Sequence, residues 1–465
     1  MATDEGRYRK WWVLAAMALC GGVIMLDETV VGVALPTLRQ DLNMTPSGAH
    51  WVISIYMLVF ACCAAAGGRL GDLIGYRRLL LLGAGLFAGG SRACGLASNG
   101  PMLIAARPVQ GLGAAAIFPM TVAMIMVAFG KERRGMAMGL LASVSTVFLA
   151  LGPITGGYLS EAVSWRWIFW INIPVVILAA AIVAVAFPRQ PSRGGREPFD
   201  VHGLVTLVGG LSLLVLAIMQ GPAWGWTSAS IVGAFAGAVG LLAVFVVVET
   251  RKDAPLINVE LFTHKSFSAA NLIMFTAQYS KIAIVVFGAL YFQDALGMQP
   301  LMAGAALLLA VAGLPFLSPW VGRVADRAGA RRLVLAGLTV ATGAMFLIAF
   351  AAAVGSFAGV ALGLVAWGLG MPFVYSPVMR EMANAVPADQ QGQVGGIGVT
   401  FRLMGGSVAA AVGSSILSSS DNFRWVFLST AVLMLVALGA GVIALKRDGA
   451  ALGEHHHHWL RFFSH

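Results

Sequence analysis

The sequence predicts an all-α integral membrane protein with 14 transmembrane helices, arranged as two pseudo-symmetric six-helix halves plus two extra central helices. Three observations carry this prediction. The chain is 59% hydrophobic and 11% charged over 465 residues, which is too apolar for a water-soluble protein of this size. Apolar runs of about 20 residues, long enough to cross a bilayer as helices, recur throughout. A tract rich in glycine and arginine occurs twice, as expected of a duplicated half.

The apolar runs fall into groups of six, two and six. The first six end at Phe187, where a tract rich in proline and arginine begins. Two more runs end near residue 248, and the charged segment 249–255 separates them from the last six. The fourteen runs lie near residues 11–36, 50–67, 79–98, 102–129, 136–160, 167–187, 201–221, 229–248, 268–292, 301–321, 333–354, 356–377, 392–418 and 425–445.

These boundaries predict four segments. Residues 1–187 form an N-terminal six-helix half, 188–255 a cytoplasmic linker with two additional transmembrane helices, and 256–448 a C-terminal six-helix half. Residues 449–465, which include four consecutive histidines, are interpreted as a disordered or tag-derived cytoplasmic tail rather than a metal site. The other loops are short and carry no phosphate-binding motif, so we expect a protein without enzymatic activity, cofactor or metal, driven by a gradient.

The basic residues are distributed very unequally between the two sides of the membrane. Loops on the side of the N-terminus hold 22 lysines and arginines, whereas the opposite side holds three: Arg39, Arg166 and Arg424. This asymmetry follows the positive-inside rule and predicts that both termini are cytoplasmic, with the protein in the cell inner membrane. The net charge of +10 is therefore explained by membrane topology, and no nucleic-acid partner is expected.

The repeated tract predicts a pair of gating loops on the cytoplasmic side. In the second copy, 254 residues later, Asp326 occupies the place of Asp72. The glycines permit a tight turn and a close helix approach, and the aspartate can accept hydrogen bonds from the N-terminus of a neighbouring helix. The arginines hold the loop at an anionic membrane face. The first copy contains Gly68, Asp72, Gly75, Arg77 and Arg78.

Five segments, in this order along the chain, resemble the fourteen-spanner drug/proton antiporter branch of the major facilitator superfamily. The resemblance covers nearly the whole chain. It implies the major facilitator fold and efflux of drugs in exchange for protons. The segments are 26–36, 68–78, 107–111, 152–157 and 165–174.

The fifth apolar run carries the motif of this branch that is taken to seal the transport route in one state. Proline inside a helix removes a hydrogen bond, and glycines allow close packing. The chain departs from the family pattern at two positions: Gly32 stands where the branch usually has asparagine, and Phe148 fills the middle glycine position of this motif. The gating residues expected here are Gly152, Pro153, Gly156 and Gly157.

Ionisable residues inside the apolar runs are functional candidates, because a charge in hydrocarbon costs about 3 kcal/mol on insertion scales. Asp27 and Arg107 lie at similar depths on the first and fourth runs. We interpret them as a proton switch, in which Asp27 exchanges its arginine partner for a proton; the alternative is a static salt bridge or a snorkelling arginine. Glu28 points about 100° away from Asp27. It lies either on the substrate or proton path or against a neighbouring helix, so which acid carries the proton stays open.

Lys281 lies near the middle of the ninth run and can bind an anion or pair with one of the two acids. The resemblance implies that Lys281 shares a cavity with Asp27 and Arg107. Arg402 is either a cavity residue or forms a structural hydrogen bond between helices, and Arg92 is interpreted as snorkelling. The full set of expected substrate-cavity residues is Gln110, Lys281, Met371, Phe373, Tyr375 and Arg402.

The expected function is proton-coupled export of amphiphilic small molecules, drugs or antibiotics, by a monomer embedded in the lipid bilayer. Three interior cations outnumber two interior acids, which favours neutral, zwitterionic or anionic substrates over dications. Export of an endogenous metabolite or lipid is the alternative within transporters. A membrane sensor or scaffold that does not transport is the alternative from another class, although a scaffold has no need for intramembrane charges.

Overall fold

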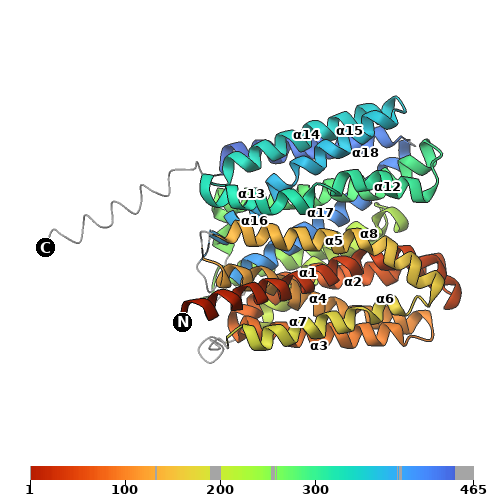
Figure 1. The fold of residues 1–465 in the computed structure, drawn as a ribbon. Helices are drawn as coiled ribbons and strands as arrows, with labels where there is room; N and C mark the ends of the chain where they lie inside the picture. The colour runs from red at the N-terminus through yellow and green to blue at the C-terminus, as the bar shows by residue number, and fades with distance from the viewer. Residues whose placement is uncertain are drawn as a thin grey trace.

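The computed structural model describes residues 2–130, 133–188, 200–252, 257, 259–384, 386, 390–420 and 422–445. All regular structure within these segments is helical, and the helices run side by side (Figure 1). The expected tail at 449–465 lies outside them, as does most of the linker that follows Phe187.

The first half contains seven helical pieces, because its sixth span is divided by a turn at Ile171. The division leaves the short helix α6 before α7. These pieces are α1 (Ala2–Asp41), α2 (Pro46–Ile74), α3 (Tyr76–Gly95), α4 (Gly100–Ala128), α5 (Arg134–Ala162), α6 (Trp167–Trp170) and α7 (Asn172–Ala186).

Two helices follow before the second half, α8 (Val201–Trp224) and α9 (Ala229–Glu249), and they pack on each other as a hairpin. Helix α8 also contacts both α2 and α17, so the hairpin lies along the line where the two halves meet. The Trp226 indole N–H, just beyond α8, donates to the Ser415 hydroxyl of α17 at 2.8 Å.

The second half repeats the six spans of the first with more breaks. The α12/α13 break precedes Pro315, and the α15/α16 break precedes Pro372, because proline cannot donate the next helical hydrogen bond. Its pieces are η2 (Val259–Thr263), α10 (Lys265–Ile282), the π-helical η3 (Ala283–Phe287), α11 (Gly288–Leu290), the π-helical η4 (Tyr291–Ala295), α12 (Pro300–Val311), α13 (Leu314–Ala328), α14 (Arg331–Ala353), α15 (Phe357–Gly370), α16 (Pro372–Asn384), α17 (Gln391–Ser420) and α18 (Phe423–Ala444).

Thirteen spans of the described chain are long and apolar enough to cross a membrane. The fourteenth helix, α3, contains Arg77, Arg78 and Arg92 and is therefore less apolar, but it packs lengthwise against α4 and α7 in the same bundle (Figure 1). The predicted all-α membrane fold with fourteen helices is confirmed.

Polar side chains define where several helices begin. Asn99 accepts from the Met102 N–H at 2.9 Å at the start of α4, and Thr45 accepts from the Gly48 N–H at 3.1 Å at the start of α2. These caps satisfy N–H groups that have no partner within the helix. The loops after α2 and α13 turn at Gly75 and Gly329, whose φ angles of 94° and 83° favour glycine.

The two halves meet along two seams, and the first of these joins α2 to α17. A Cβ atom on Gly68 would lie 2.1 Å from the Gly392 carbonyl oxygen, and one on Gly396 would lie 2.4 Å from the Ala64 oxygen. Only a hydrogen atom fits at these points. The α2 and α17 backbones are therefore in direct contact near the end of the molecule where α1 begins.

The second seam joins α5 to α13 in the same manner. A Cβ atom on Gly322 would lie 2.1 Å from the Gly135 oxygen, and one on Gly139 would lie 2.3 Å from the Ser318 oxygen. Both seams are tight at the same end of the bundle, which we call the closed end. The halves, coloured red to yellow and green to blue in Figure 1, are thus sealed against each other at the closed end.

Replacing Gly322 with valine should open the closed end, because the new side chain would overlap the Gly135 carbonyl. Overpacking of this kind costs about 1–3 kcal/mol. We expect faster maleimide labelling of a cysteine introduced at Ser318, which is buried in this seam.

Gly343→Val is the matched control, because a Cβ on Gly343 meets no atom within 4 Å. It carries the same change in helix propensity without the overlap. Equal labelling rates in the two variants would contradict the tight α5–α13 seam.

Candidate functional site

Asp27 on α1 lies at the centre of a buried polar network within the first half. Its Oδ2 atom accepts from Arg107 NH1 at 2.8 Å, and both side chains are almost completely buried. Its Oδ1 atom accepts from Gln110 Nε2 at 2.9 Å and from Asn172 Nδ2 at 3.0 Å. Three donors from α4 and α7 therefore stabilise the ionised carboxylate away from water.

Arg107 is held in place by further contacts that also belong to the first half. Its Nε atom donates to the Val52 carbonyl at 2.9 Å, and NH1 donates to Gln110 Oε1 at 2.6 Å. The guanidinium lies 4.1 Å from the centre of the Tyr56 ring and 5.7 Å from that of Phe169. Arg107 would therefore keep several partners if Asp27 were neutralised.

The structure brings together three residues expected from the sequence, Asp27, Arg107 and Gln110, but places Gln110 in this network rather than on the cavity wall. Sequence reasoning missed Asn172. A signal for it was present, since Asn172 is a polar residue between apolar neighbours at the start of the sixth span.

Glu28, the next residue on α1, faces a different environment. One of its carboxylate oxygens, Oε1, lies 3.8 Å from Arg402 NH2 on α17 and has no hydrogen-bond partner among the described residues. The adjacent acids thus divide between the halves. Asp27 is bound inside the first half, and Glu28 is turned toward the second.

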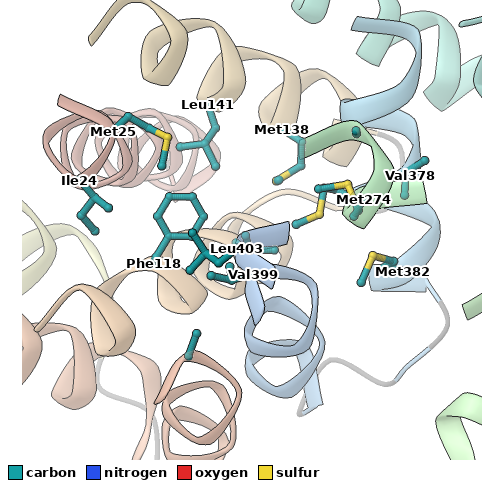
Figure 2. Packing of buried hydrophobic residues seen from close by; sticks show 14 of the residues in the cluster. Ile24, Met25, Phe118, Met138, Leu141, Met274, Val378, Met382, Val399 and Leu403 are labelled. Atoms are coloured by element: carbon teal, nitrogen blue, oxygen red, sulfur yellow. The ribbon is translucent and has the colours of Figure 1, made fainter. Parts of the chain in front are cut away.

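A cavity of about 130 Å³ lies between the halves beside Glu28's partner Arg402. Figure 2 shows several of its apolar side chains converging from α1, α4, α5 and α10. The described residues that line the cavity are Met25, Phe118, Val122, Met138, Leu141, Ala142, Ser145, Thr146, Leu149, Met274, Gln278, Lys281, Val311, Leu314, Trp367, Tyr375, Ser376, Met379, Gly398, Val399 and Arg402.

Three residues expected in the cavity lie on its wall: Lys281, Tyr375 and Arg402. The structure does not bring Met371 and Phe373 there. Met371 is fully buried at the α15/α16 break, and the Phe373 ring packs against Trp320 with centres 6.3 Å apart. The broken helix turns these two side chains away from the cavity that Tyr375 faces.

At the closed end, Asp72 binds the first turn of a helix from the opposite half. Its two oxygens accept from the N–H groups of Gly392 at 2.9 Å and Gln393 at 2.8 Å, where α17 begins. Tyr76 donates its hydroxyl hydrogen to the same carboxylate at 2.8 Å. The negative charge lies at the positive end of the α17 dipole, which stabilises the contact.

Asp326 forms the equivalent contact in the opposite direction. It accepts from the N–H groups of Gly135 at 2.8 Å and Met136 at 3.0 Å, where α5 begins. Its third donor is different, because Arg380 Nε lies 3.1 Å away and forms an ion pair. The structure therefore contains two carboxylate locks, one with a tyrosine hydroxyl and one with a guanidinium.

The arginines of the repeated loops also occupy equivalent places. Arg77 donates to the Ala184 carbonyl of α7 at 2.5 Å, and Arg331 donates to the Val442 carbonyl of α18 at 2.8 Å. Each arginine thus ties the loop to the last helix of its own half. Arg78 is exposed at the same end.

The glycine motif of the fifth span packs against α1. A Cβ on Gly152 would lie 1.8 Å from Thr29 Oγ1, and one on Gly156 would lie 2.8 Å from the Val30 oxygen. Pro153 is exposed on the outer face of α5, and a Cβ on Gly157 would meet no atom within 4 Å.

Phe148, which departs from the family motif, is accommodated by a glycine on the facing helix. A Cβ on Gly22 of α1 would lie 2.7 Å from the Phe148 ring. Gly22 leaves room for the Phe148 ring, so α1 and α5 pack closely at this level.

Comparison with known proteins gives a consistent result. The model of a family described as Major Facilitator Superfamily matches residues 17–410 and 270–459. The chain is 32% identical to the multidrug resistance protein Stp of Mycobacterium tuberculosis, over 85% of this chain and 74% of that protein. It is 31% identical to the tetracenomycin C resistance and export protein of Streptomyces glaucescens, over 96% and 83% respectively. The solved structure of the proton:xylose symporter XylE superposes with a TM-score of 0.67 at 13% identity, covering 95% of this chain and 97% of that one.

Asp326→Asn should loosen the closed end more than Asp72→Asn. An amide presents one acceptor oxygen where the carboxylate presents two, so each variant loses an N–H bond to the facing helix. Asp326→Asn also leaves Arg380, whose side chain is 15% exposed, without this carboxylate partner.

We expect both variants to raise maleimide labelling of a cysteine introduced at Ser318, with a larger fall in melting temperature for Asp326→Asn. Asp294→Asn, an exposed change outside the closed end, is the control. Wild-type labelling and melting in both variants would show that the locks do not hold the halves together.

Proposed function

The chain belongs to the major facilitator superfamily, and from this premise we propose that it exports drugs or other amphiphilic small molecules across the cytoplasmic membrane in exchange for protons. Proteins named for multidrug resistance and for antibiotic export are among its relatives over most of the chain, which supports efflux. The observation that carries the proton coupling is the fully buried Asp27 carboxylate with its single cationic partner, Arg107.

Protonation of Asp27 would change the electrostatics of the first half without dismantling it. In its ionised form the carboxylate is paired with Arg107 at 2.8 Å. A proton removes that ion pair, while Arg107 retains the Val52 carbonyl and Gln110. The lost attraction is between a residue of α1 and a residue of α4, so proton binding alters the force between these two helices.

Helix α1 can carry this change to the substrate cavity. Glu28, one residue further along, is paired with Arg402 of the second half, and Met25, half a turn earlier, lines the cavity. Gly152 and Gly156 hold α1 against α5, whose first turn is bound by Asp326. In this proposal a proton on Asp27 shifts α1 and α5 together and thereby biases the lock at the closed end.

The closed end would face the cytoplasm, because the basic loops gather on that side of the predicted topology. The structure would then be the state in which the cavity is sealed from the cytoplasm by the two carboxylate locks. Export requires a second state in which the α2–α17 and α5–α13 seams separate at this end. Loss of the two locks is the energetic cost of entering it, and substrate binding offsets part of that cost.

Asp27→Asn should abolish proton-driven export and leave substrate exchange intact. Asparagine keeps the size of aspartate and its ability to accept hydrogen bonds but does not cycle a proton. In proteoliposomes we expect accumulation of the neutral amphiphile chloramphenicol driven by a pH gradient to fall to background. Exchange of labelled for unlabelled chloramphenicol without a gradient should continue, because the cavity and the locks are unchanged.

Asp294→Asn is the matched control, since Asp294 is exposed and remote from the network. Full gradient-driven accumulation by Asp27→Asn would exclude Asp27 as the coupling acid. Absence of transport by the wild-type protein across a panel of neutral, anionic and cationic amphiphiles would contradict drug export itself, and would favour an endogenous substrate or a sensor.

A further inference from the structure

The charged groups in and beside the central cavity include more cations than anions. Lys281, in the last turn of α10, and Arg402, on α17, both line it. The nearest acid that could neutralise them is Glu28, which lies 3.8 Å from Arg402. Asp27 does not contribute, because its charge is already paired with Arg107. Two cations therefore share one carboxylate.

Arg402 has unused hydrogen-bonding capacity. Its Nε and NH2 atoms are buried and have no hydrogen-bond partner among the described residues, and NH1 reaches only the Met25 sulfur, at 3.8 Å. The guanidinium lies over the Phe118 ring, 4.7 Å from its centre, which fixes its plane beside the cavity. A guanidinium held in this way presents a fork of donors suited to a planar oxyanion.

Lys281 also lacks a close acidic partner. Within the part of the chain that the structure describes, no carboxylate oxygen lies within 4.0 Å of its ammonium. Lys281 lies two residues before the π-helical turn η3, a distortion that often marks functional positions in helices. An ammonium inside a membrane protein without a bound counter-ion is costly, so an anionic ligand would be strongly favoured there.

Two of the other polar groups on the wall already donate to backbone carbonyls. The Thr146 hydroxyl donates to the Ala142 carbonyl at 2.8 Å, and the Ser376 hydroxyl donates to the Gly135 carbonyl at 3.4 Å. The rest of the wall is mostly apolar. Four methionines contribute to it, and their flexible side chains adapt to ligands of different shape. The wall thus suits an apolar body that carries one charged head group.

We propose that this cavity selects amphiphiles with an anionic head group, a carboxylate above all, bound between Lys281 and Arg402 with the apolar body against the methionine wall. This inference rests on the proposed function for the identity of the cavity as the substrate site. The Glu28 carboxylate, 3.8 Å from Arg402 NH2, offsets one of the two positive charges, which limits the site to one anionic group and disfavours dianions. Dications are excluded by repulsion from Lys281 and Arg402.

The test is equilibrium binding to the purified full chain in detergent, at neutral pH and without any gradient. The probes are three carboxylic acids with different apolar bodies, nalidixic acid, indomethacin and dansyl-phenylalanine, each paired with its own ethyl ester. We expect each acid to bind about tenfold tighter than its ester, a difference of about 1.4 kcal/mol. Esters that bind as tightly as their acids in all three pairs, or ethidium that binds tighter than every acid, would overturn the proposal.

Substitutions of Lys281 test whether its ammonium causes the preference for acids over esters. Lys281→Met keeps the length and apolar stem of lysine, so it should remove most of the preference for the acids and leave ester affinity unchanged. Lys281→Arg should retain the preference. Arg92→Met, which removes an exposed cation of α3 outside the cavity, is the matched control. Equal losses for acid and ester in Lys281→Met, with no rescue by arginine, would assign Lys281 a structural role and refute the site.

Arg402→Gln provides an independent second variant, because it removes the guanidinium from the opposite wall. It should also reduce acid binding selectively. The binding measurements need no proton gradient, so they are separate from the test of proton-coupled export. Selective acid binding without gradient-driven transport would refute the proposed function and retain the anion site. Gradient-driven transport without selective acid binding would retain the proposed function and refute the anion site.

Discussion

The two halves of this protein are joined at one end by two carboxylates, each bound to the N–H groups that begin a helix of the other half. Asp72 binds the start of α17, and Asp326 binds the start of α5. The first N–H groups of a helix have no partner within it, so in a nonpolar interior they must be satisfied from outside. These bonds exist only while the seams are closed. The cavity, its seal and the contacts across the seams depend on this reciprocal capping.

The two locks make the same backbone contacts but differ in their third donor. Asp326 has the additional ion pair with Arg380, whereas Asp72 has the neutral Tyr76 hydroxyl. The lock on α5 therefore has a guanidinium in direct contact with its carboxylate, while Arg69 attracts Asp72 electrostatically. Since α5 also packs along α1, which bears the buried Asp27, the lock with the direct ion pair lies on the helix that would respond to protonation of Asp27 in the proposed mechanism. The repeated loop sequence accounts for the shared backbone contacts of the two locks, and single residues that the two copies do not share account for their different third donors.

Two adjacent acids on α1, Asp27 and Glu28, point in different directions around the helix and therefore meet different partners. Asp27 is enclosed by donors of its own half, and Glu28 lies 3.8 Å from Arg402 of the other half. The two acids are neighbours in sequence, but one is bound inside the first half and the other faces the second half. Small residues allow the helices around them to approach closely, since apolar burial alone gives no driving force for helix contact in lipid. The Phe148 ring of α5 packs over Gly22 of α1, so the two helices stay close although Phe148 replaces a glycine of the family motif.

The sequence by itself determined the membrane fold, the number of spans and the duplicated loop, because length, hydropathy and repetition are local properties. It also identified Asp27, Arg107, Lys281 and Arg402, since an ionisable residue in an apolar run stands out without any structure. Only the tertiary structure shows which side chains these residues and the lock carboxylates contact. Arg380 and Tyr76 on the locks carried no sequence signal for their roles, and Met371 was expected on a wall that the broken α15/α16 helix turns it away from. Spans that are apolar on every face do not encode which face meets a neighbour, so those contacts were settled only by how the helices pack.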